Sequence, residues 1–201
     1  QMELASRRLE EMIKIANEEV SASQDARTEE AVKNFTKQVQ AVKTTLENLQ
    51  TNNDSAKALE IAQIVDRKTT EYTLVLEQTK DAASDAVIKA VDVASNIVND
   101  AGIKAIQVIV NTTNDSSTGT DRQYVTTKVE DKIKIVEDQI NQMSSTSTIN
   151  GSIAQEAKDA LGEAKEALSN DNLGAVVDKL IEVKNLVNNA LPETNSTSTT
   201  K

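Results

Sequence analysis

"AVKNFTKQVQAVKTTLENLQ", residues 31–50, repeats an apolar side chain at alternating intervals of three and four residues. The repeating positions are Val32, Phe35, Val39, Val42, Leu46 and Leu49. This spacing is a heptad, in which one side of an α-helix is apolar and packs against another helix. The segment therefore predicts a long amphipathic helix inside a helical bundle.

The flanking segments repeat the same pattern. Apolar residues recur at helical spacing from Ala5 to Val20, from Val125 to Met143 and from Leu173 to Leu191. Residues 55–99 contain neither Gly nor Pro, so we expect one long central helix there, with any bend at 68–73. Residues 103–111 are rich in β-branched side chains; we interpret them as a last helical segment, with a short strand as the alternative.

The composition supports a wholly helical chain. Its 201 residues include one Pro and five Gly, too few to form the turns of a hairpin or sandwich fold. We predict an all-α fold of elongated antiparallel helical bundles that share a long central helix. The expected parts are an N-terminal lobe over 1–110, a C-terminal lobe over 120–191 and a Ser/Thr-rich tether over 192–201, with the loop 111–121 between the lobes.

Capping residues are predicted at the starts of four helices. The candidates are Asp25 or Thr28, Asp54 or Ser55, Thr120 with Gln123, and Ser152 with Gln155. A tight helical hairpin is expected at residues 169–174.

Charge and missing residue types exclude several functions. The net charge of −10 disfavours nucleic-acid binding, and no apolar run is long enough for us to expect membrane insertion within this chain. The chain has no His and no Cys, so the usual general base, thiol nucleophile and zinc ligands are missing. We therefore expect no enzyme activity, no catalytic residue, no cofactor and no metal site. A calcium loop formed by Asp115, Ser117, Gly119 and Asp121 is a weak alternative, because it lacks the bidentate Glu of an EF-hand.

Asn-x-Ser/Thr triplets are candidate glycosylation sites where they lie in loops or the tail. Five of the six triplets do so, and the candidate acceptors are Asn111, Asn114, Asn150 and Asn195. Turns are rich in Asn and Ser for conformational reasons too, and this is the simpler explanation of the triplets.

The last residues, LPETNSTSTTK (191–201), match part of a sortase signal at Leu191, Pro192, Glu193 and Thr194. Asn195 stands where that signal has Gly, and no apolar span follows it. We interpret the segment as a helix stop at Pro192 followed by a solvated tether.

LASRRLEE, residues 4–11, resembles the helical signature of an uncharacterised extracytoplasmic domain family of bacteria and archaea, a domain of unknown function. The matching residues are Leu4, Ala5, Arg7, Arg8, Leu9 and Glu11, and residues 31–50 are similar to the helix that follows in that family. The resemblance covers the first half of the chain and implies a cell-envelope or secreted location, with no known activity. In the same segment, Arg7 can pair with Glu11 along the helix, and Arg8 can reach an acidic residue on another helix to form a structural ion pair.

These observations predict a non-enzymatic, extracytoplasmic structural or interaction module, such as a spacer in a surface protein. Its partner would be another protein or a second copy of the chain. The alternative is an extracytoplasmic helical sensor that binds a small ligand or calcium between lobes. Because residue 1 is Gln and no signal peptide precedes it, we expect the chain to be a fragment of a longer precursor.

Overall fold

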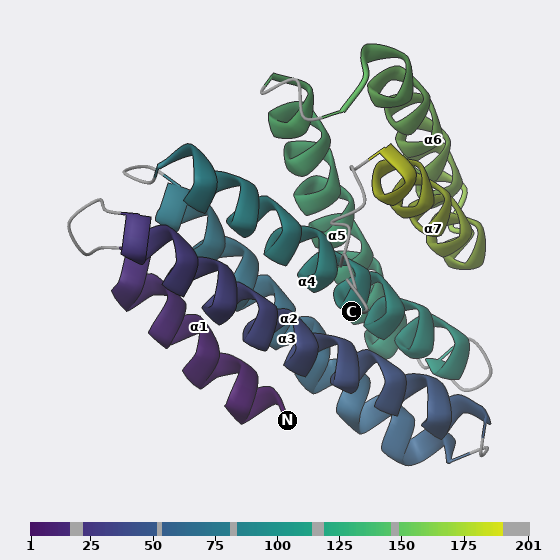
Figure 1. Ribbon diagram of the computed structural model, residues 1–201. Coiled ribbons are helices and arrows are strands. Elements are labelled where there is room, and N and C mark those ends of the chain that lie inside the picture. The colour runs from purple at the N-terminus through teal and green to yellow at the C-terminus, as the bar shows by residue number, and fades with distance from the viewer. Residues whose placement is uncertain (17–21, 52–53, 81–83, 114–118, 146–148, 191–201) are drawn as a thin grey trace, which may run out of the picture. The chain divides into compact units, whose positions relative to one another are not determined.

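A computed structural model of the protein shows seven α-helices and no β-strand in the residues that it describes (Figure 1). Those residues are 1–16, 22–51, 54–80, 84–113, 119–145 and 149–190. The helices are α1 (Met2–Ala16), α2 (Ala22–Thr51), α3 (Ser55–Lys80), α4 (Asp85–Thr113), α5 (Gly119–Ser145), α6 (Gly151–Ser169) and α7 (Leu173–Ala190). The all-α prediction is confirmed.

The chain divides into two compact units, Gln1–Val129 and Glu130–Lys201. The division lies inside α5, later in the chain than the loop 111–121 where the sequence suggested it. The start of α5 belongs to the first unit because Val125 and Val129 are buried and Lys128 forms an ion pair with Asp66 of α3.

In the first unit, α2 packs against both α1 and α4, and α4 also packs against α3. Successive helices from α1 to α4 run in opposite directions (Figure 1). The heptad of residues 31–50 forms the buried side of α2 as predicted: Val32, Phe35, Val39, Val42 and Leu46 are buried, and Leu49 is half-buried. On α1, Ala5, Leu9, Met12 and Ile15 are buried.

The expected single central helix is wrong. It is two helices, α3 and α4, that pack side by side. Lys80 Nζ lies 2.8 Å from Asp92 Oδ1, whereas an unbroken helix would separate these residues by roughly 18 Å along its axis. Residues 68–73, where a bend was expected, lie inside α3.

The chain restarts as α4 because Ser84 caps the new helix. Its Oγ accepts a hydrogen bond from Val87 N at 3.3 Å, and its carbonyl oxygen accepts one from Ile88 N at 2.9 Å. A Ser followed by Asp85 in the first helical turn is a recognisable start signal, since both favour the positive end of a helix. This signal outweighs the absence of Gly and Pro.

Helix α4 continues through Gly102 to Thr113. Residues 103–111 are therefore helical, which confirms the prediction, and the alternative of a short strand is wrong. From Ala94 onward most of its side chains are buried, including Ala94, Val98, Ile103, Ile106 and Val110. Packing by both α2 and α3 accounts for this broad apolar surface.

The predicted caps are partly correct. Asp54 caps α3, accepting a hydrogen bond from Lys57 N at 3.4 Å. Helix α2 begins at Ala22, before Asp25 and Thr28, and Thr28 is buried within it. Asn150 caps α6 in place of Ser152, because its side chain accepts a hydrogen bond from Ser152 N at 3.0 Å. Thr120 lies in α5, and its side chain is outside the described part of the chain.

In the second unit, α6 and α7 form the predicted tight hairpin. Asp171 has φ 53°, the left-handed conformation that ends many helices. Asn172 N donates to Ala167 O at 2.9 Å and Asp171 N donates to Leu168 O at 2.9 Å, which closes α6 as a Schellman motif. The side chain of Asn172 then accepts a hydrogen bond from Ala175 N at 3.1 Å and caps α7. The side chains in the hairpin core are mostly small on α6 and larger on α7. The buried residues include Ala154, Ala157, Leu161 and Ala164 on α6, and Val176, Val177, Leu180, Val183 and Val187 on α7.

Candidate interaction surface on α3

Helix α3 carries two heptad seams on opposite sides. The inner seam consists of Ala58, Ala62, Val65, Thr69, Tyr72 and Leu76, all of which are buried. Tyr72 joins three helices: its hydroxyl donates to Met2 O of α1 at 2.9 Å and is 2.8 Å from Ser6 Oγ, and its ring packs edge to face on Phe35 of α2. The inner seam therefore fixes α3 in the first unit.

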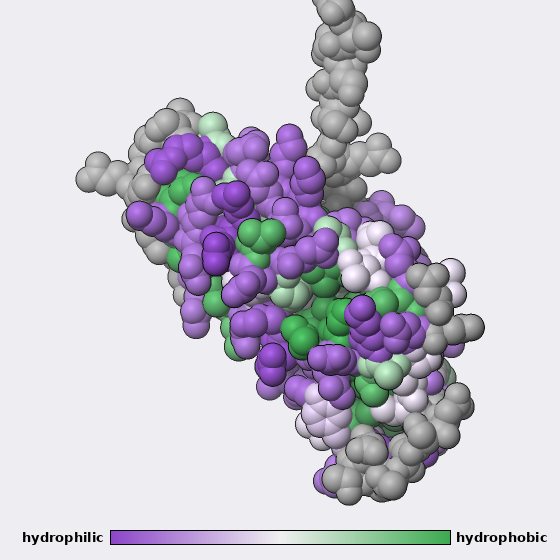
Figure 2. All heavy atoms as spheres, turned by 90° about the horizontal axis from the view of Figure 1, so that it is seen from below, coloured by the Kyte–Doolittle hydropathy of each residue, from purple (hydrophilic) through white to green (hydrophobic). Residues whose placement is uncertain are grey.

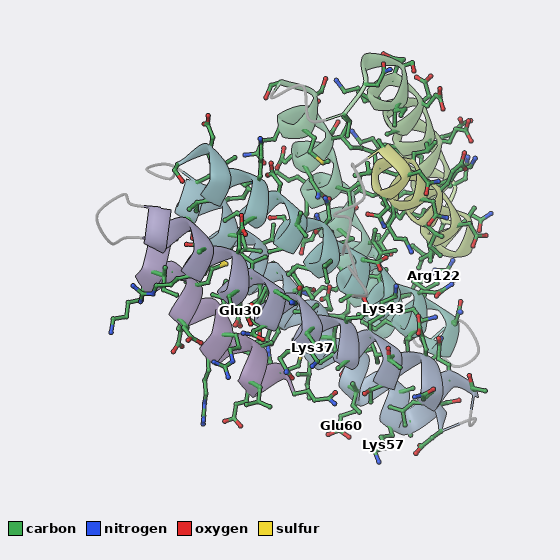
Figure 3. All side chains as sticks on the ribbon, in the orientation of Figure 1. Glu30, Lys37, Lys43, Lys57, Glu60 and Arg122 are labelled. Carbon is green, nitrogen blue, oxygen red and sulfur yellow. The ribbon has the colours of Figure 1, made fainter. Side chains whose placement is uncertain are left out.

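The outer seam has the same spacing but faces solvent. It consists of Glu60, Ile64, Arg67, Glu71, Leu74 and Gln78, all of which are exposed. Ile64 is 37% exposed and Leu74 is 62% exposed, so each presents part of an aliphatic side chain to solvent. Figure 3 shows Glu60 pointing away from the neighbouring helices. In Figure 2, apolar residues gather among hydrophilic ones on the face that it presents.

Opposite charges lie between the two aliphatic residues. Glu71 Oε2 accepts a hydrogen bond from Lys68 Nζ at 2.6 Å, and this bond raises the pKa of Lys68 above its ordinary value. Arg67 makes no ion pair with any described residue. The outer seam thus presents an apolar residue, a cation, an anion and an apolar residue in that order, and the cation is available to an external carboxylate.

Three interhelical ion pairs are defined among the described residues of the first unit. They are Lys43–Asp100 between α2 and α4, Lys80–Asp92 between α3 and α4, and Lys128–Asp66 between α5 and α3. Asp66 is buried and Asp92 is nearly so, which means that the cation beside each carboxylate offsets part of the cost of burying its charge. We interpret the pairs as structural, because each one fixes the register of two packed helices.

The sequence missed these three pairs. The signal was a charged residue directly beside an apolar seam position, as with Asp66 after Val65 and Asp92 after Val91. This signal is not specific, because Glu10, Lys33 and Glu130 also follow buried residues and are exposed.

The predicted ion pair at the N-terminus is different from the one observed. Arg8 Nη1 lies 2.6 Å from Glu11 Oε2 within α1, and both side chains are about half exposed. Arg8 therefore does not cross to another helix as we had expected, and Arg7 forms no ion pair with a described residue. An exposed pair of this kind stabilises the fold little, because water screens it.

The predicted glycan acceptors fall in different environments. Asn111 is exposed in the last turn of α4, where a loop was expected. Asn150 is exposed, and its side-chain oxygen is occupied by the cap of α6. Asn114 and Asn195 lie outside the described residues, as do Asp115 and Ser117 of the weak calcium loop and the tether 192–201. Glycosylation of these residues remains a prediction.

Each unit has a shallow hollow on the part of its surface that the structure describes. The first, of about 410 Å³, lies between α1 and α2 and is lined by Glu11, Lys14, Ile15, Arg27, Glu30, Ala31 and Asn34. The second, of about 210 Å³, lies between α5 and α6 above Gly162 and beside the ion pair Lys165–Glu137. Both are open to solvent, unlike the enclosed apolar pockets that hold small ligands.

Within the described residues, no cluster of acidic side chains is arranged to hold a metal ion. The helices there also include none with the length and hydropathy of a membrane span.

Comparison with known proteins gives no relative: no family model, no curated protein and no solved structure matches the chain. The function is therefore inferred from the residues of the chain itself.

Proposed function

We propose that the protein is a non-enzymatic helical module that binds another protein chain through the outer seam of α3. One observation carries this proposal: α3 has an inner seam that is already packed and an outer seam of the same heptad spacing that is exposed. Helices with this repeat associate with other helices, because the apolar positions interlock and the charged positions select the partner.

The chemistry of the chain supports a binding role over catalysis. A chain without His or Cys lacks the residues that most often transfer protons or attack a substrate. The interhelical ion pairs of the first unit give α3 a fixed setting, and a rigid helix face loses little conformational freedom on binding.

We also propose that the module works outside the cytoplasmic membrane, as part of a longer surface protein. This follows from the resemblance of residues 4–11 to an extracytoplasmic family and from the Ser/Thr-rich composition of residues 192–201. In that setting it would act as a spacer that also makes a protein contact.

Affinity purification from producing cells after chemical crosslinking, which retains weak contacts, tests the binding role. The tagged wild-type chain is compared with Leu74→Glu, which places a charge on the outer seam, and with Glu29→Lys, a charge change at an exposed site on α2. We expect a protein, either a second copy or a different chain, to be recovered with the wild type and with Glu29→Lys and to be lost with Leu74→Glu. Recovery of the same proteins with all three chains would show that the outer seam binds nothing.

A further inference from the structure

The outer seam of α3 has an internal symmetry about Thr69. Ile64 and Leu74 lie at equal distances before and after this residue, and so do Arg67 and Glu71. Glu60 and Gln78 complete the series at the two ends. If two such helices lie antiparallel and are related by a two-fold axis at this level, each residue faces its symmetric counterpart.

That arrangement matches every contact along the seam. Ile64 of each copy would face Leu74 of the other, and Arg67 of each copy would face Glu71 of the other. The outermost layer would pair Glu60 with Gln78, so no two like charges lie directly opposite one another. In an antiparallel pair of helices, the first seam position of each heptad faces the second seam position of the other helix. A two-fold axis makes each of these contacts occur twice.

We propose that a second copy of the chain docks on the outer seam, with the two α3 helices antiparallel about a two-fold axis at the level of Thr69. This names the partner of the surface described above and therefore rests on the proposed function. The charge pattern supports a second copy over an unrelated helix, because each copy carries both the cation, Arg67, and the anion, Glu71, that the contact pairs. Arg67, which has no ion-pair partner among the described residues, gains a carboxylate from the other copy.

The contact is small, so the association is weak. One exposed helix side from each copy buries less than about 1,200 Å², which places the contact among weak, transient interfaces. Each copy has a net charge of −10, so the measurement is made near 0.15 M salt, where charges beyond about 8 Å are screened.

A charge swap tests the pairing by sedimentation equilibrium of the purified full chain. Arg67→Glu and Glu71→Arg each place like charges opposite one another, and we expect each to raise the Kd by about tenfold or more. The double variant Arg67→Glu with Glu71→Arg restores opposite charges, and its Kd should return to within about threefold of the wild-type value. Because both residues are exposed, the helical circular dichroism signal should be unchanged in all three variants.

Lys68→Ala is the matched control. It breaks the Lys68–Glu71 pair within the helix but leaves the proposed contact between copies, so the Kd should change by less than about twofold. A double variant that associates as weakly as the single variants, or a wild-type chain that stays monomeric at millimolar concentration, would overturn the proposal.

Cysteine crosslinking tests the register, and the chain has no Cys of its own to interfere. An equal mixture of Ile64→Cys and Leu74→Cys should form disulfide-linked dimers on mild oxidation. Each variant alone should form few, because equivalent residues of the two copies lie roughly 15 Å apart along the axis. Parallel helices would give the opposite result.

The two proposals fail in different ways. A different protein recovered through Leu74, together with a purified chain that does not self-associate, would overturn the two-fold pairing and leave the binding role in place. The absence of any protein contact at Leu74 would overturn both.

Discussion

The rings of Phe35 and Tyr72 meet edge to face, with centroids 5.5 Å apart and planes inclined at 76°. Phe35 lies on the buried seam of α2 and Tyr72 on the inner seam of α3, so this contact joins two seams that the sequence presents separately. The Tyr72 hydroxyl extends the contact to α1 through Met2 O and Ser6. Three helices thus meet at two of the three aromatic residues of the chain.

Tyr72→Phe should lower the free energy of unfolding of the first unit by about 1–2 kcal/mol, because it removes two hydrogen bonds from a buried site and leaves Ser6 without that partner. Chemical denaturation measures the change. Tyr124→Phe is the matched control, since Tyr124 is exposed, and it should change the free energy by less than about 0.5 kcal/mol. Equal effects of the two substitutions would contradict the role given to Tyr72.

Burial raises the pKa of Tyr72 above its ordinary value of 10.0. The protonated phenol is then favoured in the folded state, so the contribution of Tyr72 to stability is complete below pH 10 and is lost as the pH rises through its folded-state pKa. We expect the absorbance titration of Tyr124→Phe, in which Tyr72 is the only tyrosine, to have its midpoint above pH 10. A midpoint at or below 10 would show that the hydroxyl is not in the buried setting described here.

Lys80→Ala should destabilise the first unit by about 1–3 kcal/mol, because Asp92 is only 13% exposed and loses its cation. The double variant with Asp92→Ala should recover part of this loss, and the difference gives the coupling between α3 and α4. Lys165→Ala, which breaks the exposed pair with Glu137, should change stability by less than about 0.5 kcal/mol. An absence of coupling between Lys80 and Asp92 would contradict the hairpin formed by α3 and α4.

Gly162→Ala should stabilise the second unit by about 0.5–1 kcal/mol. Gly162 lies within α6, and a Cβ added there meets no atom within 4 Å, so the gain in helix propensity has no steric penalty. The thermal unfolding midpoint measures the gain. A lowered midpoint would mean that the hollow above Gly162 is filled in solution.

Asn150→Ala should destabilise α6 by about 1 kcal/mol, since it removes the side chain that accepts the hydrogen bond from Ser152 N. Asn150→Asp keeps an accepting oxygen at the cap and should retain the stability. Both substitutions remove the predicted glycan acceptor, so comparison of the two by thermal unfolding separates the cap from any effect of a glycan.

The apolar repeat of residues 31–50 was sufficient to predict α2, and the buried residues of that helix show why. A repeat such as Val32, Phe35 and Val39 has one physical outcome in water, which is a helix with that side covered. The pairing of helices was harder to predict, because the break after Lys80 depends on Ser84 and not on Gly or Pro. The inner seam of α3 was also obscured, since Ala58, Ala62 and Thr69 contribute to it with small or polar side chains.

The outer seam could not be separated from the inner one by sequence alone. Both contain aliphatic residues at heptad spacing, and only the packing of α3 on its neighbours shows that Ile64 and Leu74 are the exposed set. The ion pair predicted between Arg8 and another helix was wrong for a different reason. Its i, i+3 partner Glu11 is close enough that no second helix is needed, and local pairing prevailed.

Photo-crosslinking at position 74 in producing cells tests the central claim most directly. With benzoylphenylalanine in place of Leu74, we predict an adduct between this chain and a protein, and we predict none with the same probe at Glu29. No protein adduct at position 74, or equal adducts at the two positions, would contradict a binding role for the outer seam of α3.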